Sequence, residues 1–597
     1  MDRNTLIQCK FWKMSDTHFI VAAIDFGTTY SGYAFQLTQD YDSKNPTFKI
    51  MSPQAWNSGK TQLTSMKTPT CLLLDNNGDL DCFGYEAEEK YANLCLDNDH
   101  GNWYYFRRFK MRLHDSSGLG THTEMDDESG RRLPAIKVFS RSIEALTSHL
   151  FKLLENKSIS VKPTEIKWLL TVPAIWDDTA KGFMREAANR AGISSENLTI
   201  CLEPEAASLF CQYLPVEKFS MGGEKGFSDS KPGTTYMIVD LGGGTADITV
   251  HEKVAAGNLK EVHRASGGPW GGTFVDSEFI QLISSIVGGP IMAAFMKEQK
   301  YDYLELMREF EAVKRKIGRG TKDTINMKLP GSLNETCQKV VKKDLKQLIK
   351  NAGKDKQITF VSDKAKFDAK LLQGCFRKAT DKIVAHMKAI FEKEPCGKNI
   401  SMILMVGGFS ESLFVHDVIK EAFGNKVGLS ILIPNDAGIS VVQGAVVLDD
   451  ATNHYVSYLR FTYGVAISPE FEEGKHDPKR RIVVDGVDHC SGCFSTFINI
   501  GTEVKIGHKV NETYQNTVAN STSVKVKVFT ANETNPTPTY VDEPGCRSIG
   551  SLDVTIKKSP KLRDIAVEYI FGDTELHLNA YDEETKEPCQ AKLRLFE

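Results

Sequence analysis

The sequence contains no apolar run of the length that a membrane-spanning helix needs. Its N-terminal part also lacks the apolar stretch of a secretion signal, because the short apolar segment at residues 19–24 already has the pattern of a strand. We therefore expect a cytoplasmic protein without a membrane partner.

Neither sign of charge is in large excess. Lys and Arg number 73 against 77 Asp and Glu, which gives a net charge of −4. A surface without a strong positive field has no general attraction for nucleic acid or for an anionic membrane. We expect no nucleic-acid partner.

Paired cysteines are scarce among the 13 cysteines of the chain. The one Cys-x-x-Cys, at residues 490–493, is followed only by the solitary Cys546 and Cys589. A cysteine zinc site usually has a second pair, so this pattern does not favour a metal or redox role. Cysteines scattered beside apolar residues are typical of reduced, buried thiols rather than of a disulfide framework.

What the chain does have is length, since 597 residues are too many for a single core and predict two to four domains. From residue 19 to 450, strand-like runs alternate with helical ones, which indicates an α/β domain. From 455 to 597, short strands of alternating polarity predict an antiparallel β-sandwich; examples are residues 523–529 and 566–570. Residues 1–18 are predicted to be a flexible lead-in.

One short pattern occurs twice within the α/β part. IDFGTTY (residues 24–30) and VDLGGGT (residues 239–245) each place an aspartate at the end of an apolar strand and before a Gly/Thr turn, and a second strand follows. Glycines let the backbone approach a ligand, and successive N–H groups and Thr hydroxyls can bind phosphate oxygens. A carboxylate beside them suits a hydrated Mg²⁺ ion. The two hairpins are therefore predicted to hold one nucleoside triphosphate between them.

Three further motifs extend this pattern in a fixed order. TVPAIWD (171–177) and LEPEAA (202–207) lie between and beside the hairpins, and MVGGFS (405–410) follows. Over residues 19–450 this order resembles the superfamily of actin, sugar kinases and 70-kDa heat-shock proteins, and VPA-x-x-D with EP-x-AA resembles the heat-shock branch. EPEAAS, MVGGFSES and the absence of a helical lid after the β-sandwich are most similar to the heat shock 70 kDa protein 12A/12B subfamily. The resemblance implies a two-lobed, actin-like ATPase domain built on a ribonuclease H-like repeat.

The resemblance also implies a site that binds ATP or ADP with Mg²⁺. Asp25, Asp240 and Glu203 would bind the metal largely through water, and Asp240 or Glu203 would orient the attacking water. Asp247 matches the same motif, although a strand-edge acid fits it equally. The other nucleotide contacts would be Gly27, Thr28, Thr29, Tyr30, Gly242, Gly243, Gly244, Thr245, Glu311, Lys314, Arg315, Gly318, Gly407 and Gly408.

The chain departs from the family pattern at several places. The catalytic lysine of the family corresponds to the stretch YYFRRFK (104–110), where either Arg107 or Lys110 would substitute. Thr273 and Phe274 replace an acidic pair, and Glu411 replaces an arginine near the adenine ring. The leucine-rich acidic linker between the domains is replaced by residues 449–460.

These features predict a slow Mg²⁺-dependent ATPase whose nucleotide state is coupled to client polypeptides on the β-sandwich. The alternative is a nucleotide-binding scaffold or signalling adaptor with little or no hydrolysis. A small-molecule kinase is the least favoured of the three, because the β-sandwich has no part in that reaction.

Overall fold

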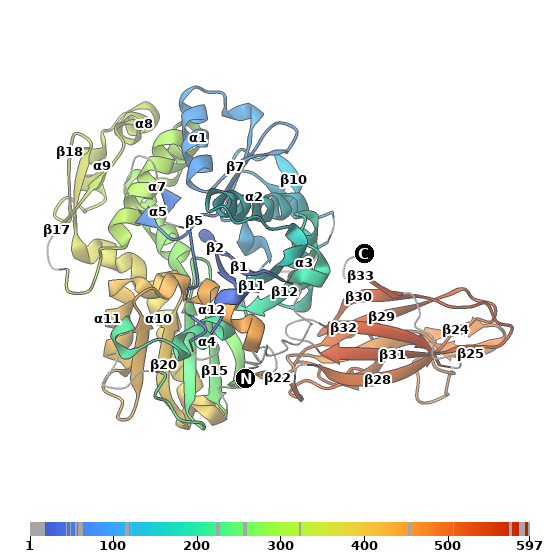
Figure 1. Cartoon of the computed structure of the whole chain (residues 1–597). Coiled ribbons are helices and arrows are strands. Elements are labelled where there is room, and N and C mark those ends of the chain that lie inside the picture. Colours follow the sequence, from blue (N-terminus) through green and yellow to red (C-terminus); the bar gives the residue numbers. More distant parts are fainter. Residues whose placement is uncertain are drawn as a thin grey trace, which may run out of the picture.

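The computed structural model describes residues 18–594 except for short gaps at 43–44, 48, 54–55, 58–63, 114–118, 121, 222–226, 255–258, 322–323, 452–454, 506, 517, 572–575 and 584–590. The predicted lead-in at 1–18 therefore lies almost wholly outside the described residues. Two α/β lobes form one body, and an elongated all-strand part extends from its side (Figure 1).

The first lobe is built on a sheet with the strand order β12-β11-β1-β2-β5. β1, β11 and β12 are parallel, and β2 returns antiparallel to β1. Nearly every residue of β1 and β11 is buried, which explains why these strands are continuous apolar runs. The strands and two covering helices are β1 (Ile20–Phe26), β2 (Tyr30–Leu37), β5 (Thr68–Pro69), β11 (Ile166–Val172), β12 (Leu198–Leu202), α2 (Ala135–Asn156) and α3 (Asp178–Arg190).

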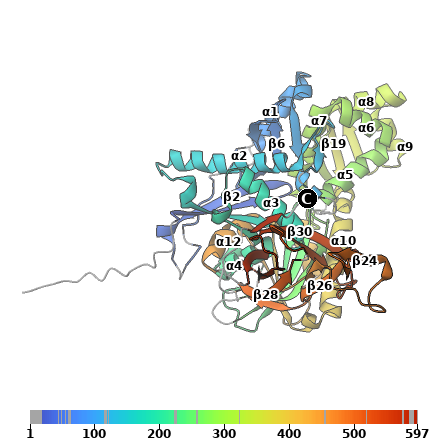
Figure 2. The ribbon, with the colours of Figure 1, turned by 90° about the vertical axis from the view of Figure 1, so that its right-hand side faces the viewer.

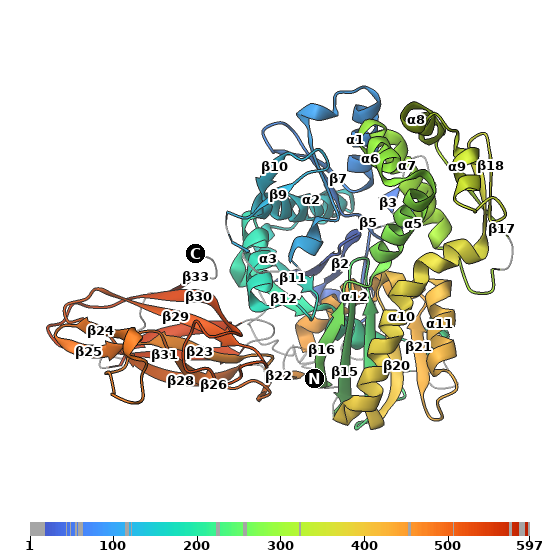
Figure 3. The same ribbon diagram turned by 180° about the vertical axis from the view of Figure 1, so that it is seen from behind.

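The second lobe repeats this arrangement in a larger sheet, β13-β21-β20-β14-β15-β16-β22-β27. Here β14 pairs antiparallel with β15 and parallel with β20, as β1 does with β2 and β11. Figure 3 shows α10 and α11 beside β20 and β21. The elements are β13 (Phe219–Met221), β14 (Thr235–Leu241), β15 (Ala246–Lys253), β16 (Leu259–Gly268), β20 (Ile400–Val406), β21 (Ser430–Pro434), β22 (Tyr455–Tyr458), β27 (Glu503–Lys505), α10 (Ala369–Lys393) and α11 (Leu413–Phe423).

Two helices, α4 (Glu203–Gln212) and α12 (Ala437–Ala451), lie between the sheets of the two lobes (Figure 1). They cross closely, since a side chain at Gly444 would overlap with the carbonyl of Ala206. Ala206 packs in a cluster with Ala23 of β1, whereas Ala207 packs with Ile238 of β14. The helix pair therefore joins the lobes at the base of the space between them.

Each lobe carries a smaller upper part. In the first lobe, β6 (Cys71–Leu74), β7 (Leu80–Phe83) and β8 (Tyr104–Arg107) form a sheet beside α1 (Tyr85–Leu96). In the second lobe, α5 (Gly272–Val287), α6 (Gly289–Glu298) and α7 (Lys300–Lys314) contribute to one hydrophobic core. No single helix among the described residues has the length and apolarity to cross a membrane; α5 and α6 pass such a test only as a pair bent by 116°.

Among the described residues after β22, two antiparallel sheets share one hydrophobic core, and residues 481–484 pair with 487–490 in a separate hairpin. The predicted alternation is confirmed, because every second residue of β31 is buried. The strands are β23 (Thr462–Ile467), β26 (Cys493–Ile498), β28 (His508–Gln515), β29 (Ser523–Ala531), β30 (Cys546–Thr555), β31 (Asp564–Phe571), β32 (Leu576–Asp582) and β33 (Ala591–Arg594). The predicted limits at 19–450 and 455–597 stay a prediction.

The C-terminal sheets contact the first lobe through the segment that precedes and begins α3. Arg547 of β30 forms an ion pair of 2.5 Å with Asp177, and the Tyr463 hydroxyl donates to Asp178 at 2.7 Å. A further ion pair, of 2.8 Å, joins Lys260 of β16 to Glu503 of β27. Figure 2, in which the C-terminal part faces the viewer, shows it in front of the lower half of the lobes.

Candidate functional site

The turns of the two predicted hairpins lie against each other at the inner ends of β1 and β14. A Cβ atom added at Gly243 would overlap with the side chain of Thr29, and one at Gly244 would lie 2.7 Å from Oγ1 of Thr28. The start of α5 docks on the second turn, because the Thr273 amide donates to the Gly243 carbonyl at 2.7 Å. The structure thus brings together two turns that are separated by more than two hundred residues in the sequence.

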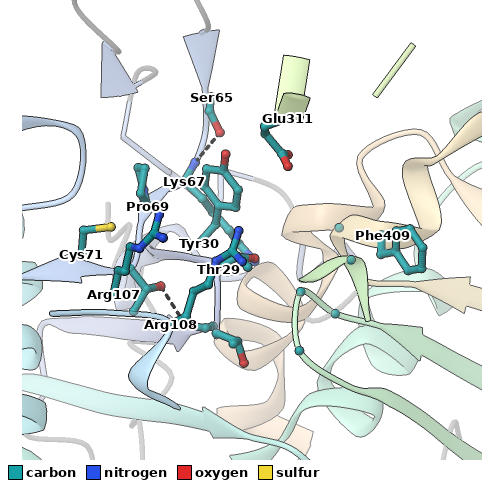
Figure 4. Close-up of a pocket in the computed structure, with 18 of the residues that line it drawn as sticks. Thr29, Tyr30, Ser65, Lys67, Pro69, Cys71, Arg107, Arg108, Glu311 and Phe409 are labelled. Carbon is teal, nitrogen blue, oxygen red and sulfur yellow. Dashed lines mark hydrogen bonds between the residues drawn. The ribbon is translucent and has the colours of Figure 1, made fainter. Parts of the chain in front are cut away.

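A cavity of about 930 Å³ opens between the lobes at this point and is large enough for a nucleotide. Figure 4 shows Tyr30, Lys67 and Arg108 on one side of it and Phe409 on the other. Gly318 does not line it, since it follows α7 and packs against Leu413. The predicted site residues that line the cavity are Asp25, Gly27, Thr28, Thr29, Tyr30, Arg107, Lys110, Glu203, Asp240, Gly242, Gly243, Gly244, Thr245, Glu311, Lys314, Arg315, Gly407 and Gly408.

A buried acidic group lies behind the two turns. Burial and the neighbouring carboxylates of Glu203, Asp247 and Asp25 raise the pKa of Asp240 well above its usual value. Burial, followed by the charge of Glu203, raises the pKa of Asp247 to about 8. Asp240 Oδ2 and Asp247 Oδ1 are buried and have no hydrogen-bond partner in the part of the chain that the structure describes. Carboxylates held together in this way fit a divalent cation, which would supply the missing partner.

Two lysines offset part of this charge. Nζ of Lys110 lies 2.9 Å from Oε1 of Glu203, and its side chain is only 3% exposed. Lys110 belongs to a short 3-10 helix, Phe109–Leu113, whose first residue packs in the core of the first lobe. The second lysine, Lys67, forms an ion pair with Asp25. Its amide also donates to Oγ of Ser65 at 3.2 Å (Figure 4).

The other predicted cation, Arg107, has a different partner. It is the last residue of β8, and its Nε lies 2.8 Å from Oε1 of Glu128. Its guanidinium lies 5.6 Å from the ring centroid of Tyr303. Both Arg107 and Lys110 line the cavity, but of the two only Lys110 has an ion pair with one of the predicted metal carboxylates among the described residues.

The far end of the cavity is formed by α7 and by the turn after β20. Burial raises the pKa of Glu311, but Lys314 and Arg315 outweigh it and lower the pKa to about 2. Arg315 lies 5.3 Å from the ring centroid of Tyr30, which links the two lobes across the cavity. Glu411, which replaces the arginine of the family, accepts from the Gly438 amide at 2.8 Å and so has a structural partner.

Gly407 begins the turn after β20 with φ +83°, a conformation that favours glycine. A side chain there would overlap with Oδ1 of Asp240. The residue therefore holds the turn directly against the acidic group and links the two ends of the cavity.

Lys67 and Asp276 line the cavity but were not predicted. Lys67 lies outside every motif. Asp276 accepts from Lys314 Nζ at 2.7 Å and from Arg108 Nη2 at 2.6 Å. It lies one helical turn after Gly272 in α5, and no motif in the sequence pointed to it.

Comparisons with known proteins agree with this geometry. The family model described as "Hsp70 protein" matches residues 141–453. The chain is 30% identical to heat shock 70 kDa protein 12B of Homo sapiens over 96% of this chain and 90% of that protein. It is 30% identical to heat shock 70 kDa protein 12A of Mus musculus over 95% and 90% of the two chains. With chloroplastic heat shock 70 kDa protein 6 of Arabidopsis thaliana it shares 24% identity over 72% of this chain and 53% of that protein.

Proposed function

Because this chain belongs to the Hsp70 family, with an actin-like ATPase fold and nucleotide binding as properties of that family, we propose that it is a slow, Mg²⁺-dependent ATPase. We further propose that its two C-terminal sheets form a β-sandwich that binds client polypeptides or signalling proteins in the cytoplasm. The observation that carries the proposal is the meeting of the two Gly/Thr turns beside a buried acidic group in which Asp240 Oδ2 and Asp247 Oδ1 have no hydrogen-bond partner among the described residues.

Each part of the site has a proposed role. The amides of Gly27 and residues 242–244, with the Thr28, Thr29 and Thr245 hydroxyls, hold the phosphates. Asp25, Asp240 and Glu203 hold the hydrated Mg²⁺ ion, which supplies neutralising charge to the phosphates when bound. Residues of α7 and the turn at 407–408 hold the nucleoside. Lys110, rather than Arg107, is the cation beside the reacting phosphate, and Asp240 or Glu203 orients the water.

Binding and hydrolysis are tested together by replacing Asp240 with asparagine. In the wild type, ATP with Mg²⁺ should raise the melting temperature, because ligands that bind only the folded state stabilise it. In Asp240→Asn, the Mg²⁺-dependent part of this rise should disappear, since the carboxylate that neutralises the cation is lost. A single-turnover assay with labelled ATP should show phosphate release that falls by about 10²-fold or more in the variant.

A scaffold or adaptor without hydrolysis is the second candidate, and one contact favours it. Lys67 forms an ion pair with Asp25, so this predicted metal carboxylate, like Glu203 with Lys110, has a cationic partner without a metal. Under this alternative, ATP still stabilises the wild type, but phosphate release is absent and does not depend on Asp240. A failure of ATP to stabilise the wild type with Mg²⁺ present would contradict both candidates.

The segment of residues 173–178 gives a physical route between nucleotide and C-terminal sheets. Pro173 and Trp176 line the cavity, and the Trp176 ring lies 5.0 Å from Nζ of Lys110. Asp177 of the same segment caps α3 through the Ala180 amide and forms the ion pair with Arg547. A shift of Lys110 on nucleotide binding would therefore reach β30 through one short turn.

Replacing Arg547 with alanine should uncouple the two parts without abolishing nucleotide binding. We expect ATP to slow or accelerate hydrogen exchange in β23 and β30 of the wild type, and this difference to be largely lost in Arg547→Ala. The matched control is Lys509→Ala, because Lys509 pairs with Glu568 at 3.0 Å within the C-terminal sheets. An unchanged ATP response in Arg547→Ala would exclude this route.

A further inference from the structure

A cluster of two cysteines and one histidine lies in the C-terminal part, well away from the nucleotide cavity. One side-chain donor atom from each of His476, Cys490 and Cys493 lies within 4.8 Å of the others. Figure 1 shows β24 (Arg481–Val484) and β25 (Val487–Cys490), the hairpin that leads into the cluster, at the end of the C-terminal part remote from the lobes.

From this cluster we infer a zinc site with Cys490 Sγ, Cys493 Sγ and a ring nitrogen of His476 as three ligands. Zinc–sulfur bonds of ~2.3 Å and zinc–nitrogen bonds of ~2.0 Å place tetrahedral ligand atoms roughly 3.5–3.8 Å apart. The spacing of the cluster needs only a small contraction to reach this geometry. The fourth position is open to water or to a donor from another molecule.

The local backbone holds the three ligands in place. Gly492, with φ +72°, turns the chain between the two cysteines at the junction of β25 and β26. The Glu472 amide donates to Nδ1 of His476 at 3.0 Å, so Nδ1 carries the lone pair and is the nitrogen that would bind zinc in place of this hydrogen bond.

Burial supplies an independent argument. All residues from Ser468 to Gly492 are described, and among them only His476 and Cys490 are buried. Ile482, Val483 and Val487 of the hairpin are exposed, and none of the three belongs to the C-terminal hydrophobic core. A segment of this size in which no apolar residue other than Cys490 is fully buried needs another means of holding its fold, and a bound metal is one that small modules use.

The surrounding charges do not oppose a cation. The two basic residues nearest the thiols, Lys475 and Arg480, are each paired with a carboxylate, Glu472 at 2.8 Å and Asp542 at 2.6 Å.

From the sequence alone, the single Cys-x-x-Cys did not favour a zinc site, because a cysteine zinc site usually has a second cysteine pair. The third ligand is a histidine from the loop before β24, which no spacing of cysteines reveals. The site is separate from the proposed nucleotide site, so either proposal can fail without the other.

The test measures zinc in the full chain, purified under reducing conditions without chelators. We expect about one zinc ion per chain in the wild type and a large loss in Cys490→Ser, Cys493→Ser and His476→Ala. The matched control is Cys546→Ser, since Cys546 is half-buried in the same part of the chain and its thiol donates to the Tyr540 carbonyl. This control should retain the metal.

A second measurement guards against variants that simply fail to fold. Co²⁺ added to the metal-free wild type should give the visible spectrum of a tetrahedral thiolate site, and Cys490→Ser should weaken its thiolate charge-transfer band. Metal removal should accelerate hydrogen exchange at 468–492 but not in the lobes. Equal zinc in the wild type and the three variants, or a metal-free wild type with a Cys490–Cys493 disulfide, would overturn the proposal.

Discussion

Replacing Lys110 with methionine should slow single-turnover phosphate release by about 10²–10³-fold, the usual effect of removing one charge-stabilising donor from an active site. The ammonium group is held by Glu203 at 2.9 Å and is nearly inaccessible to water. A cation fixed in this way can stabilise charge on the reacting phosphate without first reorganising. Methionine keeps most of the side-chain volume against Trp176 but removes the charge, so ATP should still stabilise the protein.

The variant Arg107→Gln decides between the two cations that the sequence left open. Because Arg107 pairs with Glu128 rather than with a metal carboxylate, its loss should change the fold stability more than the rate. Phosphate release close to that of the wild type is expected. If Arg107→Gln were as slow as Lys110→Met, the assignment of Lys110 would be wrong.

Most of the fold could be predicted because its signals are local. The apolar strands at β1 and β14, the aspartate at each strand end and the glycine turns all lie within a few residues of one another. Alternating polarity is equally local, and it predicted β29 and β31. The duplicated pattern then predicted two hairpins in equivalent positions, and the cavity lies between the lobes where these hairpins meet.

The residues that were missed have partners distant in the sequence. Lys67 pairs with Asp25 across a separation of 42 residues, and Asp276 meets Lys314 across 38. No periodicity or motif relates such positions, so only the tertiary arrangement of the lobes brings them together. Gly318 is the opposite case: the family motif predicted it as a nucleotide contact, but it does not line the cavity. His476 was missed for the same reason as Lys67, because only the tertiary structure brings it close to Cys490 and Cys493.

The contact between the two turns predicts a second large effect, in Gly243→Ala. The new methyl group would overlap with the side chain of Thr29, so the hairpins must separate. Overpacking of this kind costs about 1–3 kcal/mol. We expect ATP affinity, measured by calorimetry with Mg²⁺, to fall by roughly 10–100-fold. The backbone amide that would bind phosphate is retained, so the loss would come from the position of the turn.

Gly242→Ala is the matched control, because it adds the same methyl group to the same turn. There the nearest atom, the Thr245 carbonyl oxygen, lies at an ordinary contact distance of 3.5 Å. This variant should bind ATP with an affinity near that of the wild type. An equal loss in both variants would show that a ligand, and not Thr29, needs the space over the turn. Unchanged affinity in Gly243→Ala would mean that the two turns need not touch, and the proposed grip on a single triphosphate would lose its structural basis.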